Sequence, residues 1–227
     1  MSAPLRLVIF DVDGTLVDSQ GDIVAAMTAA FQSVDQAPPD RKTILGVVGL
    51  SLDVIMPRLL PALSDAAHAR MVEAYKAAYM TLRASAGVAQ SSPLYPGALD
   101  ALRGLNAVPE VLLGVATGKS RRGLDKLIEG HRLDGLFVTQ QVADHHPSKP
   151  HPSMILQALS DTGVDPHQAV VVGDTSFDME MAAAAGVRGI GVSWGYHDRA
   201  RLAGAAQVID AFSQLRPALD AIWGVPA

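Results

Sequence analysis

Short apolar runs alternate with amphipathic stretches along most of the chain. The clearest runs span residues 5–10, 111–116, 169–172 and 187–192. They show little polar alternation, which is typical of strands buried on both faces of a parallel sheet. Weaker candidates are residues 136–139 and a short edge strand at 207–209. The pattern therefore predicts a sheet of buried, parallel strands.

The stretches between these strands have helical spacing. We expect helices at residues 97–105, 120–129, 152–162, 177–185 and 211–223. Ser120 is a suitable N-cap and Gly186 a suitable C-cap residue for two of them. Strand–helix alternation with right-handed crossovers predicts an α/β fold, a Rossmann-like doubly wound parallel sheet.

One region breaks this alternation. Between residues 19 and 92 no strand is convincing, and the spacing predicts helices at residues 21–33, 41–47, 52–60 and 66–84. We interpret this region as an α-helical cap inserted after the first strand. The expected division is a core of residues 1–17 and 94–227 and a cap of residues 18–93, with hinges near residues 17–19 and 92–96.

Composition excludes several classes of protein. The chain has 227 residues, enough for a core without disulfides, and its lack of cysteine rules out zinc–thiolate sites and a cysteine nucleophile. The net charge is −5, the basic residues are scattered and aromatic residues make up 5%, so nucleic acid is not an expected partner. No apolar run approaches the roughly 18 residues of a membrane span. We expect a cytoplasmic protein without a membrane partner.

Chemically active side chains stand at the ends of the predicted strands, where open α/β sheets bind their ligands. DVDGTLVDS follows the first strand, TGKS the second and GDTSFDM the strand at 169–172, while SKPHP precedes the helix at 152–162. Together these segments supply acids, a hydroxyl, a lysine and glycines. That set suits a phosphate group and a hard metal ion.

Asp11 and Asp13 pose a question about charge, because carboxylates two residues apart repel each other. Mg²⁺ takes oxygen ligands, and it would offset the repulsion among Asp11, Asp13 and Asp174. Gly14 allows a sharp turn with exposed backbone amides, which suits an anion. The segment therefore predicts a metal site beside a phosphate site.

Each motif alone has an ordinary structural explanation, since strand-end aspartates often cap turns. Their joint appearance in order favours function, with Lys149 at a phosphate site and Asp178 placed to hold metal-bound water or to orient Lys149. Ser19 has no histidine–aspartate pair to activate it, so we interpret it as a helix N-cap. One short loop rarely completes a transition-metal site, so three histidines are interpreted as loop residues: His145, His146 and His151.

With these residues identified, the chain is similar to the haloacid dehalogenase superfamily, and within it to the phosphoglycolate-phosphatase-like branch with a helical cap. Four motifs match in order: FDVDGTLVDS, VATGKS, SKPHP and VVGDTSFDM. YPG at residues 95–97 resembles the return from cap to core, and VSWGYHD resembles a loop common in this branch. The resemblance covers essentially the whole chain.

The resemblance implies a role for each core residue. Asp11 would be the nucleophile and a metal ligand, and Asp13 the general acid and base, with its backbone carbonyl also on the metal. Lys149 would neutralise the transferring phosphoryl group. A carboxyl group with an ordinary pKa of about 3.9 is ionised at neutral pH, so Asp11 would attack phosphorus without a base. The remaining implied contacts are Thr117 and Gly118 to the phosphoryl group and Asp174 to Mg²⁺.

The implied activity is Mg²⁺-dependent hydrolysis of a small phosphate ester, phosphoglycolate-like or a sugar phosphate, through an aspartyl-phosphate. A phosphomutase of the β-phosphoglucomutase kind would use the same aspartates and stays open. A 2-haloacid dehalogenase would lack the second aspartate, so Asp13 argues against that activity. A non-catalytic sensor of phosphorylated metabolites would not need the full set of catalytic side chains.

Substrate identity depends on the cap in this resemblance. The segment at residues 46–53 looks like the cap loop that faces the site, which makes Gly49, Leu50 and Ser51 candidate substrate contacts. The second motif departs from the family, which often has Ser or Asn where this chain has Thr117, Gly118 and Lys119. The weaker candidate anion contacts are Arg41, Lys42 and Arg58. The expected assembly is a monomer or a homodimer.

Overall fold

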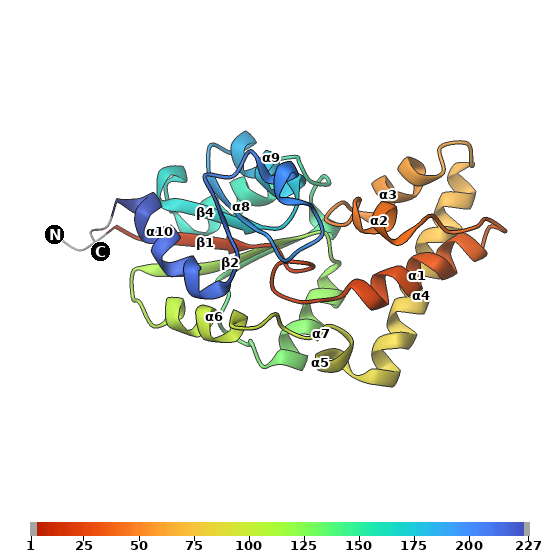
Figure 1. Cartoon of the computed structure of the whole chain (residues 1–227), viewed down its shortest axis with the longest axis horizontal. Coiled ribbons are helices and arrows are strands. Elements are labelled where there is room, and N and C mark those ends of the chain that lie inside the picture. The colour runs from red at the N-terminus through yellow and green to blue at the C-terminus, as the bar shows by residue number, and fades with distance from the viewer. Residues whose placement is uncertain (1–3, 225–227) are drawn as a thin grey trace.

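The computed structural model describes residues 4–224, and at its centre lies a six-stranded sheet (Figure 1). All neighbouring strands are parallel, in the order β3-β2-β1-β4-β5-β6. The predicted Rossmann-like parallel sheet is confirmed, and its first strand lies near the centre. The strands are β1 (Arg6–Phe10), β2 (Val111–Thr117), β3 (Thr139–Val142), β4 (Ala169–Gly173), β5 (Arg188–Val192) and β6 (Gln207–Ile209).

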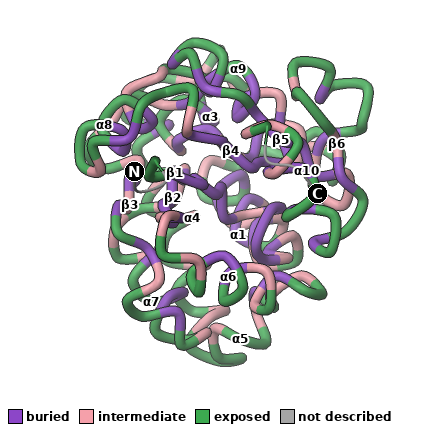
Figure 2. Tube along the Cα trace, turned by 90° about the vertical axis from the view of Figure 1, so that its left-hand side faces the viewer, coloured by how far each residue is buried: buried purple, intermediate pink, exposed green. Residues whose placement is uncertain are grey.

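Helices cover both faces of the sheet, which explains why its strands are apolar throughout. Leu7 and Ile9 of β1 share a core with α8 (Ser153–Thr162) and α9 (Ser176–Ala184). Val8 and Phe10 point the other way. They share a second core with three helices: α6 (Ala98–Asn106), α7 (Arg121–His131) and α10 (Leu215–Trp223). Figure 2 shows buried residues concentrated along β1 and β4.

In the described part of the chain, four single-turn 3₁₀ helices lie outside the region expected to be a cap. The predicted helix at residues 211–223 is divided into a 3₁₀ turn, η4 (Phe212–Gln214), and α10. The others are η1 (Ala143–His145), η2 (Pro166–Gln168) and η3 (Arg199–Leu202). Within residues 4–224, no helix combines the length and the apolar character that crossing a bilayer requires.

The prediction for the third strand is wrong by three residues. Residues 136–139 were expected from their apolar side chains, but β3 begins at Thr139 and Val138 is 57% exposed. The strand is polar because Thr139 and Gln141 both donate hydrogen bonds to Oδ2 of Asp161, each at 2.7 Å. A buried strand whose polar groups are satisfied in this way does not appear as an apolar run.

The region expected to be a cap consists of helices with a core of their own. Their bounds are α1 (Gln20–Gln32), α2 (Arg41–Leu45), α3 (Leu52–Leu59), α4 (Asp65–Ala86) and α5 (Val88–Ser91). The long α4 lies alongside α1, and the short α5, which was not predicted, packs on α7 (Figure 1). Six of the residues in this separate core are Ile23, Met27, Phe31, Ile44, Met56 and Met71.

The two chain crossings between sheet and cap helices lie side by side. Val17 forms an antiparallel bridge with Leu94, and the amide of Asp18 donates to the carbonyl of Pro93 at 2.8 Å. The division at residues 17/18 and 93/94 and the hinges near it stay predictions.

Candidate functional site

The carboxyl ends of three adjacent strands bring the predicted site residues together. Asp11 follows β1, Thr117 is the last residue of β2 and Asp174 follows β4. Because β1 lies between β2 and β4 in a parallel sheet, these three side chains meet at one edge. Lys149, from the loop before α8, reaches the same edge and is 2% exposed.

Lys149 connects two carboxylates at the bottom of the site. Its ammonium donates to Oδ1 of Asp11 at 2.6 Å and to Oδ1 of Asp178 at 2.7 Å, and all three side chains are buried. Asp178 is fixed on its other side, because its Oδ2 accepts from Oγ1 of Thr175 at 2.6 Å and, in a capping box at the start of α9, from the Thr175 amide at 3.0 Å. The predicted proximity of Asp178 to Lys149 is present in the structure.

Asp174 is fixed equally firmly. Its Oδ1 accepts from Oγ1 of Thr15 at 2.9 Å, and its Oδ2 accepts from the backbone N–H of Tyr196 at 2.8 Å. A Cβ atom on Gly14 or on Gly195 would collide with the Asp174 side chain. The two glycines therefore allow backbone from separate segments to enclose this carboxylate.

Burial changes the protonation of the acids. Burial and the negative charge of Asp178 together raise the pKa of Asp11 to about 7, against the attraction of Lys149. Burial also raises the pKa of Asp174, as do the charges of Asp11 and Asp178. The expectation that Asp11 has an ordinary pKa is therefore wrong for the metal-free protein. Neighbouring charges must lower that pKa again for full ionisation at neutral pH.

Asp11, Asp174 and Asp178 fit a divalent-cation site. Each offers one carboxylate oxygen, and these oxygens lie within 4.8 Å of one another. Oδ2 of Asp11 is buried and has no hydrogen-bond partner among residues 4–224. A buried oxygen without a partner costs free energy, which a hard cation with oxygen ligands would recover. Asp178, expected only to support the metal, belongs to this group, and the Asp13 carboxylate does not.

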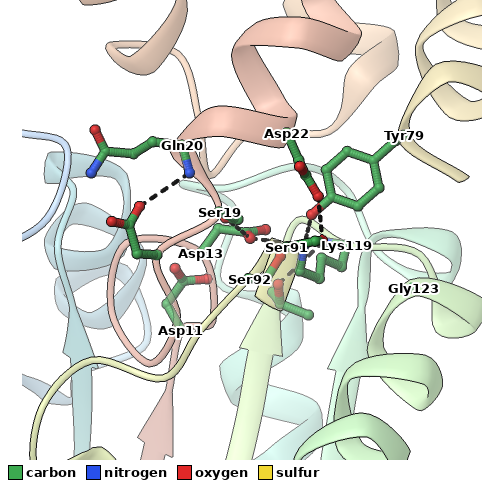
Figure 3. Close-up of polar contacts among 12 residues, drawn as sticks. Asp11, Asp13, Ser19, Gln20, Asp22, Tyr79, Ser91, Ser92, Lys119 and Gly123 are labelled. Carbon is green, nitrogen blue, oxygen red and sulfur yellow. Dashed lines mark hydrogen bonds and ion pairs between the residues drawn. The ribbon is translucent and has the colours of Figure 1, made fainter. Parts of the chain in front are cut away.

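Asp13 lies in a separate polar cluster above Asp11 (Figure 3). Its Oδ1 is 2.8 Å from Nζ of Lys119 and also accepts a short hydrogen bond from Oγ of Ser19. Burial alone would lower the pKa of Lys119, but the negative charge of Asp13 raises it above its usual range, so the lysine stays charged. Ser19 stands at the N-cap position of α1 without capping it, because its hydroxyl is engaged by Asp13 and by Tyr196 Oη at 3.0 Å. The N-cap role expected for its side chain is wrong.

The predicted phosphate contacts lie near Asp11 but differ in availability. Oγ1 of Thr117 accepts from the Lys119 amide at 3.2 Å. The Gly14 amide donates to the carbonyl of Val17 at 2.9 Å, so in this structure it is not available to an anion as expected. A Cβ on Gly118 would lie 2.8 Å from the carbonyl oxygen of Gly49. The missing side chain at position 118 therefore allows the cap loop to approach the core closely.

A cavity of about 580 Å³ opens from Asp11 and Asp13 toward α4 and α7. Gly49 and Leu50, two of the predicted substrate contacts, line this cavity, whereas Ser51 donates its amide to Oγ of Ser148 at 2.9 Å. The cationic side chains suggested for the cap lie elsewhere. Lys42 pairs with Asp198 at 3.6 Å, Arg58 lies over the ring of Phe177 and Arg41 donates to Gln20.

Sequence reasoning missed the basic residues that do line this cavity. Lys119 directly follows the TG pair at the end of β2, which is the signal that could have identified it. Arg83 stands four residues after Tyr79, and helical spacing places both on one side of α4. The cavity's basic lining residues are Lys76, Arg83, Lys119, Arg122 and Lys126.

The loop histidines are engaged in local contacts. Nδ1 of His146 is 2.8 Å from Oγ of Ser153, and its Nε2 is 2.8 Å from Oε1 of Gln141. Nδ1 of His151 accepts from the Ser153 amide at 3.2 Å. These contacts connect the loop to α8 and β3.

Known proteins resemble this chain in both sequence and structure. The family model of the haloacid dehalogenase-like hydrolases matches residues 8–192. A probable phosphatase of Dickeya dadantii, IndB, is 34% identical over 223 residues, which cover 95% of this chain and 94% of that protein. A phosphoglycolate phosphatase of Rhodospirillum rubrum is 32% identical over 98% of this chain and 97% of its own. The crystal structure of a hydrolase from Pseudomonas syringae superposes with a TM-score of 0.83 at 27% identity, over 96% of this chain and 99% of that one.

Proposed function

The chain belongs to the haloacid dehalogenase-like hydrolase family, and from this premise we propose that it is a Mg²⁺-dependent phosphatase that hydrolyses a small phosphate monoester through an aspartyl-phosphate on Asp11. One observation carries the proposal. The buried arrangement of Asp11, Lys149, Asp174 and Asp178 lies at the end of a cavity that also contains Asp13.

Asp11 is the proposed nucleophile. A carboxylate oxygen of Asp11 forms a bond to phosphorus while the bond between phosphorus and the leaving oxygen breaks. Lys149, 2.6 Å from Oδ1 of Asp11, fixes the orientation of this carboxylate and opposes its protonation. Its positive charge also offsets negative charge on the phosphoryl oxygens as they approach.

Asp13 is the proposed general acid and base. It lines the cavity beside Asp11, where it can give a proton to the leaving oxygen. In the second step water attacks phosphorus, Asp13 takes a proton from that water, and the bond from phosphorus to Asp11 breaks to release inorganic phosphate. Lys119 and Ser19 hold the Asp13 carboxylate in place for both transfers.

Asp11, Asp174 and Asp178 would hold the cation, with Thr15 and the Tyr196 amide keeping Asp174 in position. When bound, Mg²⁺ supplies positive charge that stabilises the transferring phosphoryl group and keeps these carboxylates ionised.

The test is phosphate release from an aryl phosphate with and without Mg²⁺, combined with Asp13→Ala. An aryl leaving group needs little protonation, so attack by Asp11 should survive in part. Hydrolysis of the intermediate should slow by roughly 10²–10⁴-fold. The variant should therefore release a burst of the phenol and accumulate a hydroxylamine-labile phosphoryl group, mapped by mass spectrometry to Asp11. The same experiment with Asp11→Asn should show neither burst nor adduct.

Two results would overturn the proposal: an adduct on another residue, or full turnover after exhaustive chelation. A phosphomutase would use the same aspartates, so the assay includes an arm with added sugar bisphosphate. A strict requirement for the bisphosphate would favour the mutase over the phosphatase.

A further inference from the structure

The cavity beside Asp11 is larger than a two-carbon acid phosphate needs. Its volume of about 580 Å³ lies within the roughly 300–1,000 Å³ of pockets that enclose drug-sized ligands. It begins at Asp11 and Asp13 and extends to the N-terminal turn of α7, where Gly123 and Arg122 line it. Phosphoglycolate, the substrate in the names of several relatives, would leave most of this space to water.

Part of the cavity wall is apolar and aromatic. Ile23 and Met27 of α1 and Ile55 of α3 line it. Tyr75 and Tyr79 of α4 also line it, with their rings stacked at a centroid distance of 5.9 Å and an interplanar angle of 16°. Aromatic side chains favour stacked or edge contacts with other rings. This wall therefore suits a substrate body that is apolar and planar.

Two cations contact Tyr79, and one of them, Lys119, is also paired with Asp13. Figure 3 shows the Tyr79 ring reaching from α4 toward Lys119, whose Nζ is 3.2 Å from Oη and 5.1 Å from the ring centroid. The guanidinium carbon of Arg83 lies 4.8 Å from the same centroid. Because Lys119 is paired with Asp13, the positive charge that remains for a substrate beside Tyr79 is that of Arg83.

Arg83 has hydrogen-bonding capacity that the protein leaves unused. Its Nη1 donates to the carbonyl of Gly123 at 3.1 Å. Its Nε and Nη2 are buried, and no residue in the described part of the chain accepts from them. Buried donors without acceptors cost free energy, and a small rotation of the guanidinium toward an anionic acceptor in the adjoining cavity would satisfy them.

We propose that the substrate is a phosphate monoester with an apolar ring as its body and a second anionic group at the far end of that ring, held by Arg83 and Arg122. This inference rests on the proposed phosphatase activity and names the substrate class for the same site. The phosphate lies at Asp11, the ring lies against Tyr75 and Tyr79, and the second anion lies between α4 and α7.

The test compares ligands that differ in charge at one position. 4-Carboxyphenyl phosphate and 4-carbamoylphenyl phosphate have similar shapes and similar leaving groups, and only the first has the second anion. Hydrogen bonds to charged groups contribute about 1.5–3 kcal/mol, so kcat/KM for the carboxylate should be about 10–100-fold higher. It should also exceed kcat/KM for phosphoglycolate.

Variants assign the preference to Arg83. In Arg83→Gln the ratio of the two aryl substrates should fall toward one, while Arg70→Gln, an exposed arginine on the same helix that does not line the cavity, should keep the wild-type ratio. If Arg83→Gln does not fold by circular dichroism, Arg122→Gln replaces it and should lower the same ratio. A wild-type ratio near one, or a preference for phosphoglycolate over both aryl esters, would overturn the inference.

A binding measurement separates the proposed phosphatase activity from the proposed ligand class. Calorimetry compares the matching 4-carboxybenzyl and 4-carbamoylbenzyl phosphonates on the Mg²⁺-loaded wild-type protein. Tenfold tighter binding of the carboxylate without turnover of any ester would refute the phosphatase and keep the ligand class. Turnover of all esters with equal phosphonate affinities would refute the ligand class alone.

Discussion

Replacing the proposed nucleophile should stabilise the metal-free protein. Asp11→Asn keeps the shape of the side chain and leaves an oxygen to accept from Lys149, but it removes a buried charge beside Asp174 and Asp178. Lys149 keeps its contact with Asp178 at 2.7 Å, so the substitution does not leave the lysine without a carboxylate. Most substitutions destabilise a protein, so a gain would be unusual.

The size of the gain follows from the pKa of Asp11, which is raised from 3.8 to about 7 with the attraction of Lys149 already included. A difference of about three pH units corresponds to about 4 kcal/mol. The sign follows from linkage. Between these two values the folded state binds more protons than the unfolded state, so stability falls as the pH rises. The penalty of the charged Asp11 is complete above pH 7 and disappears as the pH falls toward 3.8.

Urea unfolding in EDTA, followed by circular dichroism from pH 5 to pH 9, measures this difference. At pH 8 Asp11→Asn should be more stable than wild type by up to about 4 kcal/mol, and the gap should narrow by about 1.4 kcal/mol for each pH unit below 7. Asp134→Asn, at an exposed position, should match wild type throughout. Added Mg²⁺ should stabilise wild type more than Asp11→Asn. A less stable Asp11→Asn variant at pH 8, or a gap independent of pH, would refute the electrostatic reasoning.

Three further predictions concern the cap contacts and the metal. Gly118→Ala places a Cβ 2.8 Å from the carbonyl oxygen of Gly49, so kcat/KM should fall and the free energy of unfolding should drop by about 1–3 kcal/mol. Gly104→Ala, where nothing lies within 4 Å of the added Cβ, should lower neither quantity. Equal kinetics in the two variants would contradict the close approach of the cap loop to the core. Burial lowers the pKa of His197, whose neutral ring accepts from the Ser176 amide and donates to the carbonyl of Gly46. The stabilisation by this neutral ring is therefore complete above pH 6.5 and is lost as the pH falls below that value. His197→Gln should flatten this pH dependence in thermal unfolding from pH 5 to pH 8. Mg²⁺ should support turnover and excess Ca²⁺ should inhibit it, because Ca²⁺ prefers longer bonds and more ligands; undiminished phosphate release with excess Ca²⁺ would contradict the Mg²⁺ assignment.

The sequence predicted elements whose stability comes from apolar burial. The runs of β1, β2, β4 and β5 were recognisable because helices cover both faces of the sheet. β3 was misplaced because its polar side chains are satisfied by Asp161, a partner whose position depends on the packing of α8. A pattern along the chain cannot show where a distant hydrogen-bond acceptor lies.

The candidate site likewise has residues that the sequence identified and properties that it could not show. Asp11 and Asp174 stand at strand ends and Lys149 lies in the recognisable motif before α8, so the sequence was sufficient to select them. The raised pKa of Asp11 depends on burial that only the folded chain creates. Arg83 was missed because its importance depends on the distance from α4 to α7, which the order of residues does not specify.

The position of β1 in the sheet also determines when it can fold on the ribosome. Its residues leave the exit tunnel before those of both partner strands, because Arg6 pairs with Val111 and Leu7 with Ala169. The helices from α1 to α4 emerge in between and contain an apolar core of their own. During that interval the nascent chain carries an apolar strand with two unpaired edges, the kind of segment that non-local topologies expose to aggregation. The strand that Asp11 follows therefore stays without its β4 partner until the chain beyond Ala169 has been synthesised.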